Sequence, residues 1–121
     1  MMSKFITYVS VLKYDLIKGN VNRKSLNFFR NTNISVIVWF ILLEGFYNRQ
    51  DTNLESIIDE VNKLSKISRP TIVKILENAI SLKLVIKEKS KIDARKMLFK
   101  PSSLTINEFE EWSDNFFNLR Y

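Results

Sequence analysis

The sequence predicts a mainly α fold with one small β-hairpin. Two short amphipathic helical segments follow each other closely within residues 52–82, and two apolar strand-like segments come directly after them. Helices joined by a tight connection form a helix-turn-helix, and a hairpin placed behind such a pair is a wing. We therefore expect one winged helix-turn-helix domain over residues 1–121, with dimerisation helices in 1–31, the core in 32–104 and a C-terminal helix in 105–121.

The first expected element is an amphipathic helix over residues 5–18, followed by a stop signal at Gly19-Asn20 and a short apolar continuation at residues 25–29. The apolar side chains of this helix recur at helical spacing, at Phe5, Val9, Leu12 and Leu16. The segment 31–33 then offers Asn and Thr side chains as N-caps for the next helix.

Residues 34–47 are apolar almost all round, which predicts a central helix that is buried on most faces. A domain of this size covers such a helix with difficulty, and the stripe of residues 5–16 has no evident cover either. We therefore expect burial against a second subunit, so that the terminal helices form a dimer interface. The alternative is that residues 34–47 are the core helix of a monomer.

The helix-turn-helix is expected between Thr52 and residue 82. Thr52 and Glu55 form a T-x-x-E capping box, which predicts a helix start. Ser68 is placed to cap a second helix, with Pro70 in its first turn. The inward faces of the two helices are expected to be formed by Leu54, Ile57, Ile58, Val61 and Leu64, and by Ile72, Ile75, Leu76, Ala79 and Ile80.

The hairpin is expected to pair residues 84–88 with residues 97–100, joined by the charged loop 89–96 and ended by Pro101. Thr105 and Glu108 form a second capping box, which predicts the start of a final helix. Its aromatic side chains are expected in the core or the dimer face rather than around a ligand. They are Phe109, Trp112, Phe116, Phe117 and Tyr121, with Leu119 at the same helical spacing.

Composition argues against an enzyme and against a bound cofactor. The chain has no Cys and no His, which removes disulfides, thiolate catalysis, Cys-ligated zinc and the commonest general base. Two glycines cannot build a glycine-rich phosphate loop. A metal-dependent nuclease would need clustered carboxylates. The acidic residues in question are expected instead to be helix-start and solvent-face charges, and they are Asp51, Glu55, Asp59 and Glu60.

The longest apolar run, residues 36–43, is far shorter than the roughly 20 residues that span a bilayer. The amino terminus also lacks a signal-peptide cleavage pattern. A cytoplasmic protein that does not bind membranes is therefore expected.

Positive charge is concentrated in one segment of the chain. Residues 61–100 carry 11 basic and 3 acidic side chains, a net charge of +8, whereas the whole chain has +6. Such a surface attracts a polyanion, since each neutralised phosphate releases condensed counterions. The alternative is a lysine-rich face that only favours solubility. Because the segment coincides with the helix-turn-helix, the sequence favours DNA.

The helix over residues 68–82 is then the recognition helix in the major groove. Arg69 is expected to pair with guanine, and Thr71 to bond a base edge or a phosphate. Val73 is expected to be exposed and to contact a thymine methyl group, while Lys74 meets a phosphate. Asn78 and Ser81 complete the outward face.

The segment from Ser68 to Asn78, the Leu84-Val85 pair and Asp93-Ala94-Arg95 together resemble the MarR-like winged-helix family, including its SarA-type members, over about residues 32–105. The third segment stands where that family has a D-x-R wing signature. The resemblance implies that Arg95 enters the minor groove and that Asp93 positions it. Flanking backbone contacts would come from Lys89, Lys91 and Lys96 in the wing at residues 84–100. Lys83 stands where the family often has Gly.

The resemblance implies a homodimeric, sequence-specific regulator of transcription that binds pseudo-palindromic double-stranded DNA. A small-molecule effector is possible, although no residue identifies one. Two other interpretations stay open: a winged-helix module that binds an acidic protein, and an architectural protein that coats DNA with little sequence preference.

Overall fold

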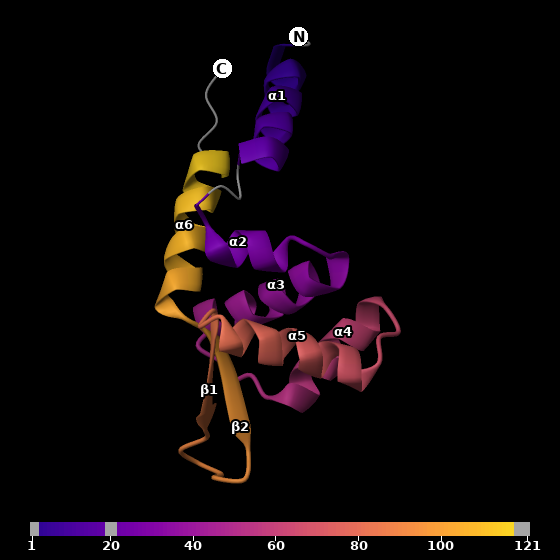
Figure 1. Ribbon diagram of the computed structural model, residues 1–121, viewed down its shortest axis with the longest axis vertical. Coiled ribbons are helices and arrows are strands. Elements are labelled where there is room, and N and C mark those ends of the chain that lie inside the picture. Colours follow the sequence, from indigo (N-terminus) through magenta and orange to yellow (C-terminus); the bar gives the residue numbers. More distant parts are fainter. Residues whose placement is uncertain (1–2, 19–21, 118–121) are drawn as a thin grey trace.

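The computed structural model describes residues 3–18 and 22–117, which form six helices and one antiparallel hairpin. In chain order they are α1 (Ser3–Lys18), α2 (Lys24–Phe29), α3 (Asn33–Tyr47), α4 (Leu54–Leu64), α5 (Arg69–Ser81), β1 (Val85–Lys89), β2 (Met97–Pro101) and α6 (Ser103–Phe117). Figure 1 shows the hairpin projecting from one end, with α1 and the end of α6 at the other. The predicted fold class is confirmed.

The core forms around α3, whose Val38, Trp39 and Leu42 are at most 1% exposed. Ile57 and Val61 of α4 belong to the same buried cluster, as do side chains of α5 and of both strands. The prediction that this helix is buried on most faces is therefore confirmed. The expectation that it needs a second subunit is wrong for Val38, Trp39 and Leu42, because elements of the same chain cover them.

The start of α4 differs from the predicted Thr52–Glu55 box. The cap is Asn53, whose side chain accepts a hydrogen bond from the Ser56 N–H at 2.9 Å, while Ser56 Oγ accepts from the Asn53 N–H at 3.1 Å. Thr52 is buried, and its carbonyl accepts the Phe99 N–H of β2 at 2.8 Å. Tertiary pairing with the hairpin thus moves the helix start by one residue.

Helix α5 begins as predicted, with the Ser68 side chain accepting from the Thr71 N–H and Pro70 in the first turn. It ends in a Schellman motif, in which the Leu84 N–H donates to Ala79 O and the Lys83 N–H to Ile80 O. Lys83 has the left-handed φ of 61° that this motif requires. The motif directs the chain from α5 into β1.

The two strands pair in register from Val85 opposite Pro101 to Lys89 opposite Met97. Pro101 is therefore the last residue of β2, rather than a residue beyond the hairpin. A bridge between Asn53 and Leu98 ties the other edge of β2 to the start of α4. Through this bridge the wing has a fixed position relative to the helix-turn-helix.

The predicted Thr105–Glu108 box at the start of α6 is also wrong. The helix begins at Ser103, and the Ser102 side chain accepts from the Thr105 N–H at 3.3 Å. Thr105 is buried and donates its hydroxyl to Leu84 O at 2.7 Å. Glu108 instead accepts from Ser25 N and Oγ, at 2.8 and 2.5 Å, and so caps α2.

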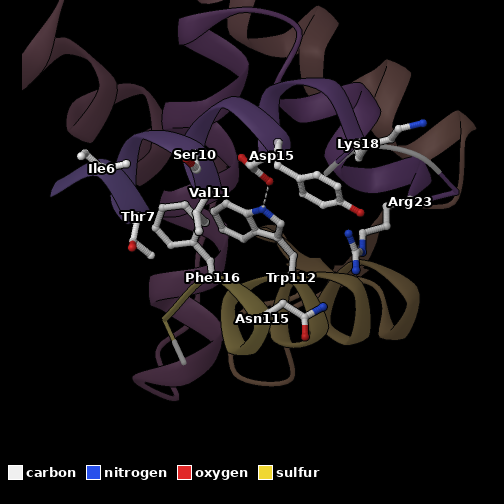
Figure 2. A pocket seen from close by; sticks show the side chains of 11 residues that line it. Ile6, Thr7, Ser10, Val11, Asp15, Lys18, Arg23, Trp112, Asn115 and Phe116 are labelled. Atoms are coloured by element: carbon white, nitrogen blue, oxygen red, sulfur yellow. Dashed lines mark hydrogen bonds between the residues drawn. The ribbon is translucent and has the colours of Figure 1, made fainter. Parts of the chain in front are cut away.

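Helix α1 is joined to the rest of the molecule through Asp15. Its carboxylate accepts from Trp112 Nε1 of α6 at 2.6 Å (Figure 2). The same carboxylate pairs with Arg30 at 2.8 Å. The predicted apolar stripe is exposed, with Phe5 at 51%, Val9 at 64%, Leu12 at 49% and Leu16 at 76%. Three predictions lie outside the described residues: the stop at Gly19-Asn20 and the placements of Leu119 and Tyr121. Within those residues, no helix has both the length and the apolar character needed to cross a membrane.

Candidate nucleic-acid interface

The loop between the strands is held by short-range hydrogen bonds. Ser90 Oγ accepts from the N–H groups of Ile92 and Asp93, both at 3.2 Å. The Lys96 N–H donates to Asp93 O, and the Ser90 N–H to Lys96 O, both at 2.9 Å. These bonds give the wing tip a defined conformation, although its side chains are largely solvated.

Within this loop, the Asp93 carboxylate accepts from the Arg95 backbone N–H at 3.1 Å and from Arg95 Nε at 3.2 Å. The backbone hydrogen bond, followed by the side-chain one, lowers the pKa of Asp93 below its usual value of 3.8. The carboxylate is therefore ionised at neutral pH and orients a guanidinium whose side chain is 91% exposed. This is the contact that the wing signature implied, and it presents Arg95 at the end of the hairpin.

Arg69 occupies the first position of α5, and its Nη2 lies 2.6 Å from Glu55 Oε1 of α4. The hydrogen bond from Arg69 lowers the pKa of Glu55, and the same bond raises that of Arg69. The exposed Thr71 hydroxyl lies 2.8 Å from Ser68 Oγ. Both predicted base-reading side chains are therefore at the exposed amino end of the helix, each with a partner inside the protein.

The remaining predicted contact residues on α5 are exposed or partly exposed. Lys74 is exposed, as are Asn78 and Ser81. Val73 is partly exposed rather than fully exposed, and its contact with a thymine methyl group stays a prediction. The buried positions Ile72 and Leu76 lie on the inward face, as predicted.

A groove of about 390 Å³ lies where the starts of α4 and α5 meet the hairpin. It brings together the predicted residues Arg69, Arg95 and Lys96, which come from the helix and the wing. Its lining residues are Asn53, Leu54, Glu55, Arg69, Lys87, Arg95, Lys96, Met97 and Phe99. The start of α5 and the wing therefore contribute basic side chains to one groove.

Sequence reasoning missed Lys87, which lines the same groove with its Nζ 5.9 Å from the centre of the Phe99 ring. Strand alternation would not have singled it out, because residues 87 and 89 share one side of β1 and only Lys87 lines the groove. Lys89 and Lys91 are exposed on the wing but are not among the residues that line the groove.

A second cavity, of about 540 Å³, lies between α1 and α6 at the end of the molecule away from the hairpin (Figure 2). Trp112, Phe116 and Val11 give it apolar walls, and Asp15 and Lys18 add charged groups. Among the described residues, no cluster of acidic side chains could hold a metal ion.

No protein-family model matches the sequence, and no curated protein matches it either. Solved structures do match the fold. S. aureus MepR in complex with DNA has a TM-score of 0.63 and 16% identity over 87% of this chain and 72% of that one. NadR in complex with 4-hydroxyphenylacetate gives 0.58 and 18% identity, covering 89% and 71% of the two chains. Heme-bound PefR, a heme sensor protein from Streptococcus agalactiae, gives 0.57 and 12%, covering 94% and 74%. These proteins are MarR-family regulators of transcription rather than enzymes, and the chain has their winged helix-turn-helix fold.

Proposed function

We propose that the protein is a sequence-specific regulator of transcription that binds double-stranded DNA, with α5 in the major groove and the hairpin at the minor groove. The observation that carries this proposal is the basic groove in which Arg69 of the helix and Arg95 and Lys96 of the wing meet. Cations on one surface can engage neighbouring phosphates and base edges together. The similar fold of MepR, solved with DNA, supports the same assignment.

The wing favours DNA over an acidic protein partner. Arg95 is oriented by Asp93 at an exposed tip, and a narrow minor groove attracts an inserted Arg. The amino end of α5 presents Arg69 and Thr71, the positions from which a recognition helix reaches bases. We accordingly assign no enzymatic activity to the chain and expect it to act in the cytoplasm, where its DNA would be.

The proposed assembly is a homodimer formed through the terminal helices. The exposed stripe of Phe5, Val9, Leu12 and Leu16 on α1 has no cover within the described chain. Two-fold symmetry would place two α5 helices about one helical turn of DNA apart, roughly 34–36 Å, which matches a pseudo-palindrome. Sedimentation of Leu12→Glu should show a shift toward monomer, whereas Lys13→Glu, one residue away on the same helix, should leave the dimer intact. A wild-type monomer at all concentrations would refute the assembly.

An effector site would fit the cavity between α1 and α6, whose volume lies in the range of small-molecule pockets. NadR and PefR were solved with 4-hydroxyphenylacetate and heme, so these compounds are reasonable first probes. A rise in melting temperature with either probe would support an effector. An unchanged melting temperature with both compounds would exclude them as effectors.

The central experiment compares two duplexes of equal length and composition. One is recovered from genomic fragments by the wild-type protein, and the other is its scrambled version. A preference of at least about a hundredfold is expected of a regulator. Equal, weak binding would favour an architectural protein, and no binding to either would favour a protein-interaction module.

A further inference from the structure

One acidic side chain lies in the otherwise basic groove. Among the residues that line it, Glu55 is the single carboxylate, beside Arg69, Lys87, Arg95 and Lys96. A carboxylate on a surface that faces phosphates opposes binding through repulsion. Glu55 therefore cannot serve to attract DNA, and we looked for another role at this position.

Glu55 and Arg69 connect the two helices of the helix-turn-helix at their amino ends. Glu55 lies in the first turn of α4, and Arg69 is the first residue of α5, with 2.6 Å between Oε1 and Nη2. Both helix starts are fixed by side-chain caps, at Asn53 and at Ser68. The backbones that carry the pair therefore have defined positions.

This ion pair contributes little to folding. The Glu55 side chain is 64% exposed and that of Arg69 55%, and exposed pairs add little stability because water screens them. What the contact does determine is the position of the guanidinium. An Arg side chain without a partner can swing to the nearest phosphate of any sequence, whereas one N–H of Arg69 is directed to Glu55 and the others remain free.

We propose that Glu55 is a positioning residue that increases sequence discrimination by holding Arg69 toward the bases and away from phosphates. This inference rests on the proposed DNA-binding function. A phosphate has to displace the carboxylate from Arg69, on any sequence. A guanine at the right position offers O6 and N7 to the N–H groups that Glu55 leaves free, so it can be bound while the carboxylate stays in place. Glu55 therefore weakens binding to all DNA, and most strongly to DNA without that guanine.

The test measures affinities of wild type and Glu55→Gln for the recovered duplex and for its scrambled version. The variant is expected to bind the scrambled duplex more tightly, and the ratio of the two affinities should fall by about fivefold or more, the lower end of what one base contact contributes. Glu60→Gln is the matched control, because Glu60 pairs with Lys63 at 2.7 Å on the same helix but does not line the groove. It should change both affinities equally. Glu55→Asp should restore part of the ratio.

A double-mutant comparison of Glu55 and Arg69 provides the second readout. In an Arg69→Gln background, Glu55→Gln should leave the ratio unchanged, because no guanidinium remains to be positioned. Parallel increases on both duplexes in the single variant would overturn the proposal and leave a simple charge effect. Equal or absent binding by the wild type would instead refute the DNA-reading function before any variant is compared. Melting curves check that each variant is folded.

Discussion

The Asp93 carboxylate contacts Arg95 twice, through the backbone N–H at 3.1 Å and through Nε at 3.2 Å. The two residues are separated by one position, so the contact is local and forms within the loop itself. It orients an almost fully exposed guanidinium without support from the core. The wing therefore presents its cation before DNA arrives, which reduces the ordering cost of binding.

Arg95→Ala should weaken binding to the recovered duplex by about 1–3 kcal/mol. The melting temperature should stay unchanged, because the side chain is 91% exposed. Fluorescence anisotropy and thermal melting together check both parts. Lys13→Ala, which removes an exposed cation from α1 at the other end of the molecule, serves as control and should leave affinity near that of wild type. If Arg95→Ala bound DNA with wild-type affinity, the assignment of Arg95 to the DNA interface would be refuted.

Lys74→Ala should reduce the salt dependence of binding. Lys74 is exposed on α5, and we expect its ammonium to meet a phosphate. Loss of one phosphate contact lowers the slope of log affinity against log salt by about 0.9 per protomer. Discrimination between the recovered and scrambled duplexes should change little, because a phosphate contact carries no sequence information. An unchanged slope would show that Lys74 faces away from the DNA.

Local signals predicted the fold where the partners are close in sequence. Ser68 caps α5 as expected, and its partner Thr71 is three residues away. Both T-x-x-E boxes failed because tertiary partners compete for the same side chains. The Thr105 hydroxyl donates to Leu84 O, Glu108 caps α2 through Ser25, and Glu55 pairs with Arg69. A four-residue sequence pattern cannot predict any of these partners, because each lies far away in the sequence.

In the candidate site, too, contacts that are local in sequence were predictable and tertiary contacts were not. The Asp93–Arg95 contact was predictable, since both residues belong to one short loop. The groove was not, because the starts of two helices and the hairpin all contribute to it. Lys87 faces it only because the Asn53–Leu98 bridge fixes the hairpin against α4. Sequence reasoning therefore found Arg69, Arg95 and Lys96 one by one, but neither Lys87 nor the carboxylate beside them.

Gly45→Ala should destabilise the protein by about 1–3 kcal/mol. A Cβ at this position would overlap with Thr52 Oγ1, while the next nearest atoms, at 3.5 and 3.6 Å, are at ordinary contact distance. The Thr52 carbonyl is bound to the Phe99 N–H, which fixes its backbone, so relief would require rotation of a buried Thr52 side chain. Chemical denaturation gives the free energy of unfolding. In a Thr52→Ala background the penalty of Gly45→Ala should disappear, and a penalty that persists there would contradict this explanation.

Tyr47 should resist ionisation. Partial burial, together with the hydrogen bond from its hydroxyl to Glu110 at 2.7 Å, raises its pKa from 10.0 to about 12. The folded-state pKa lies above the unfolded one, so the stabilising contribution is complete below pH 10.0 and is lost as the pH rises through about 12. Ultraviolet difference titration of wild type against Tyr47→Phe isolates this phenol. Glu110→Gln should shift its midpoint toward 10.0, and an unshifted midpoint would mean that the carboxylate has no influence.

Lys83→Gly should stabilise the protein by about 0.5–1 kcal/mol. Lys83 adopts φ of 61°, a left-handed conformation that costs a residue with a Cβ but is accessible to glycine. The backbone hydrogen bonds of the Schellman motif need no side chain at this position, so glycine keeps both of them. Lys83→Ala is the control, because it removes the same charge and retains the Cβ. Equal stabilisation by both variants in chemical denaturation would assign the effect to charge. A gain confined to glycine would show that the left-handed turn between α5 and β1 is strained when residue 83 carries a Cβ.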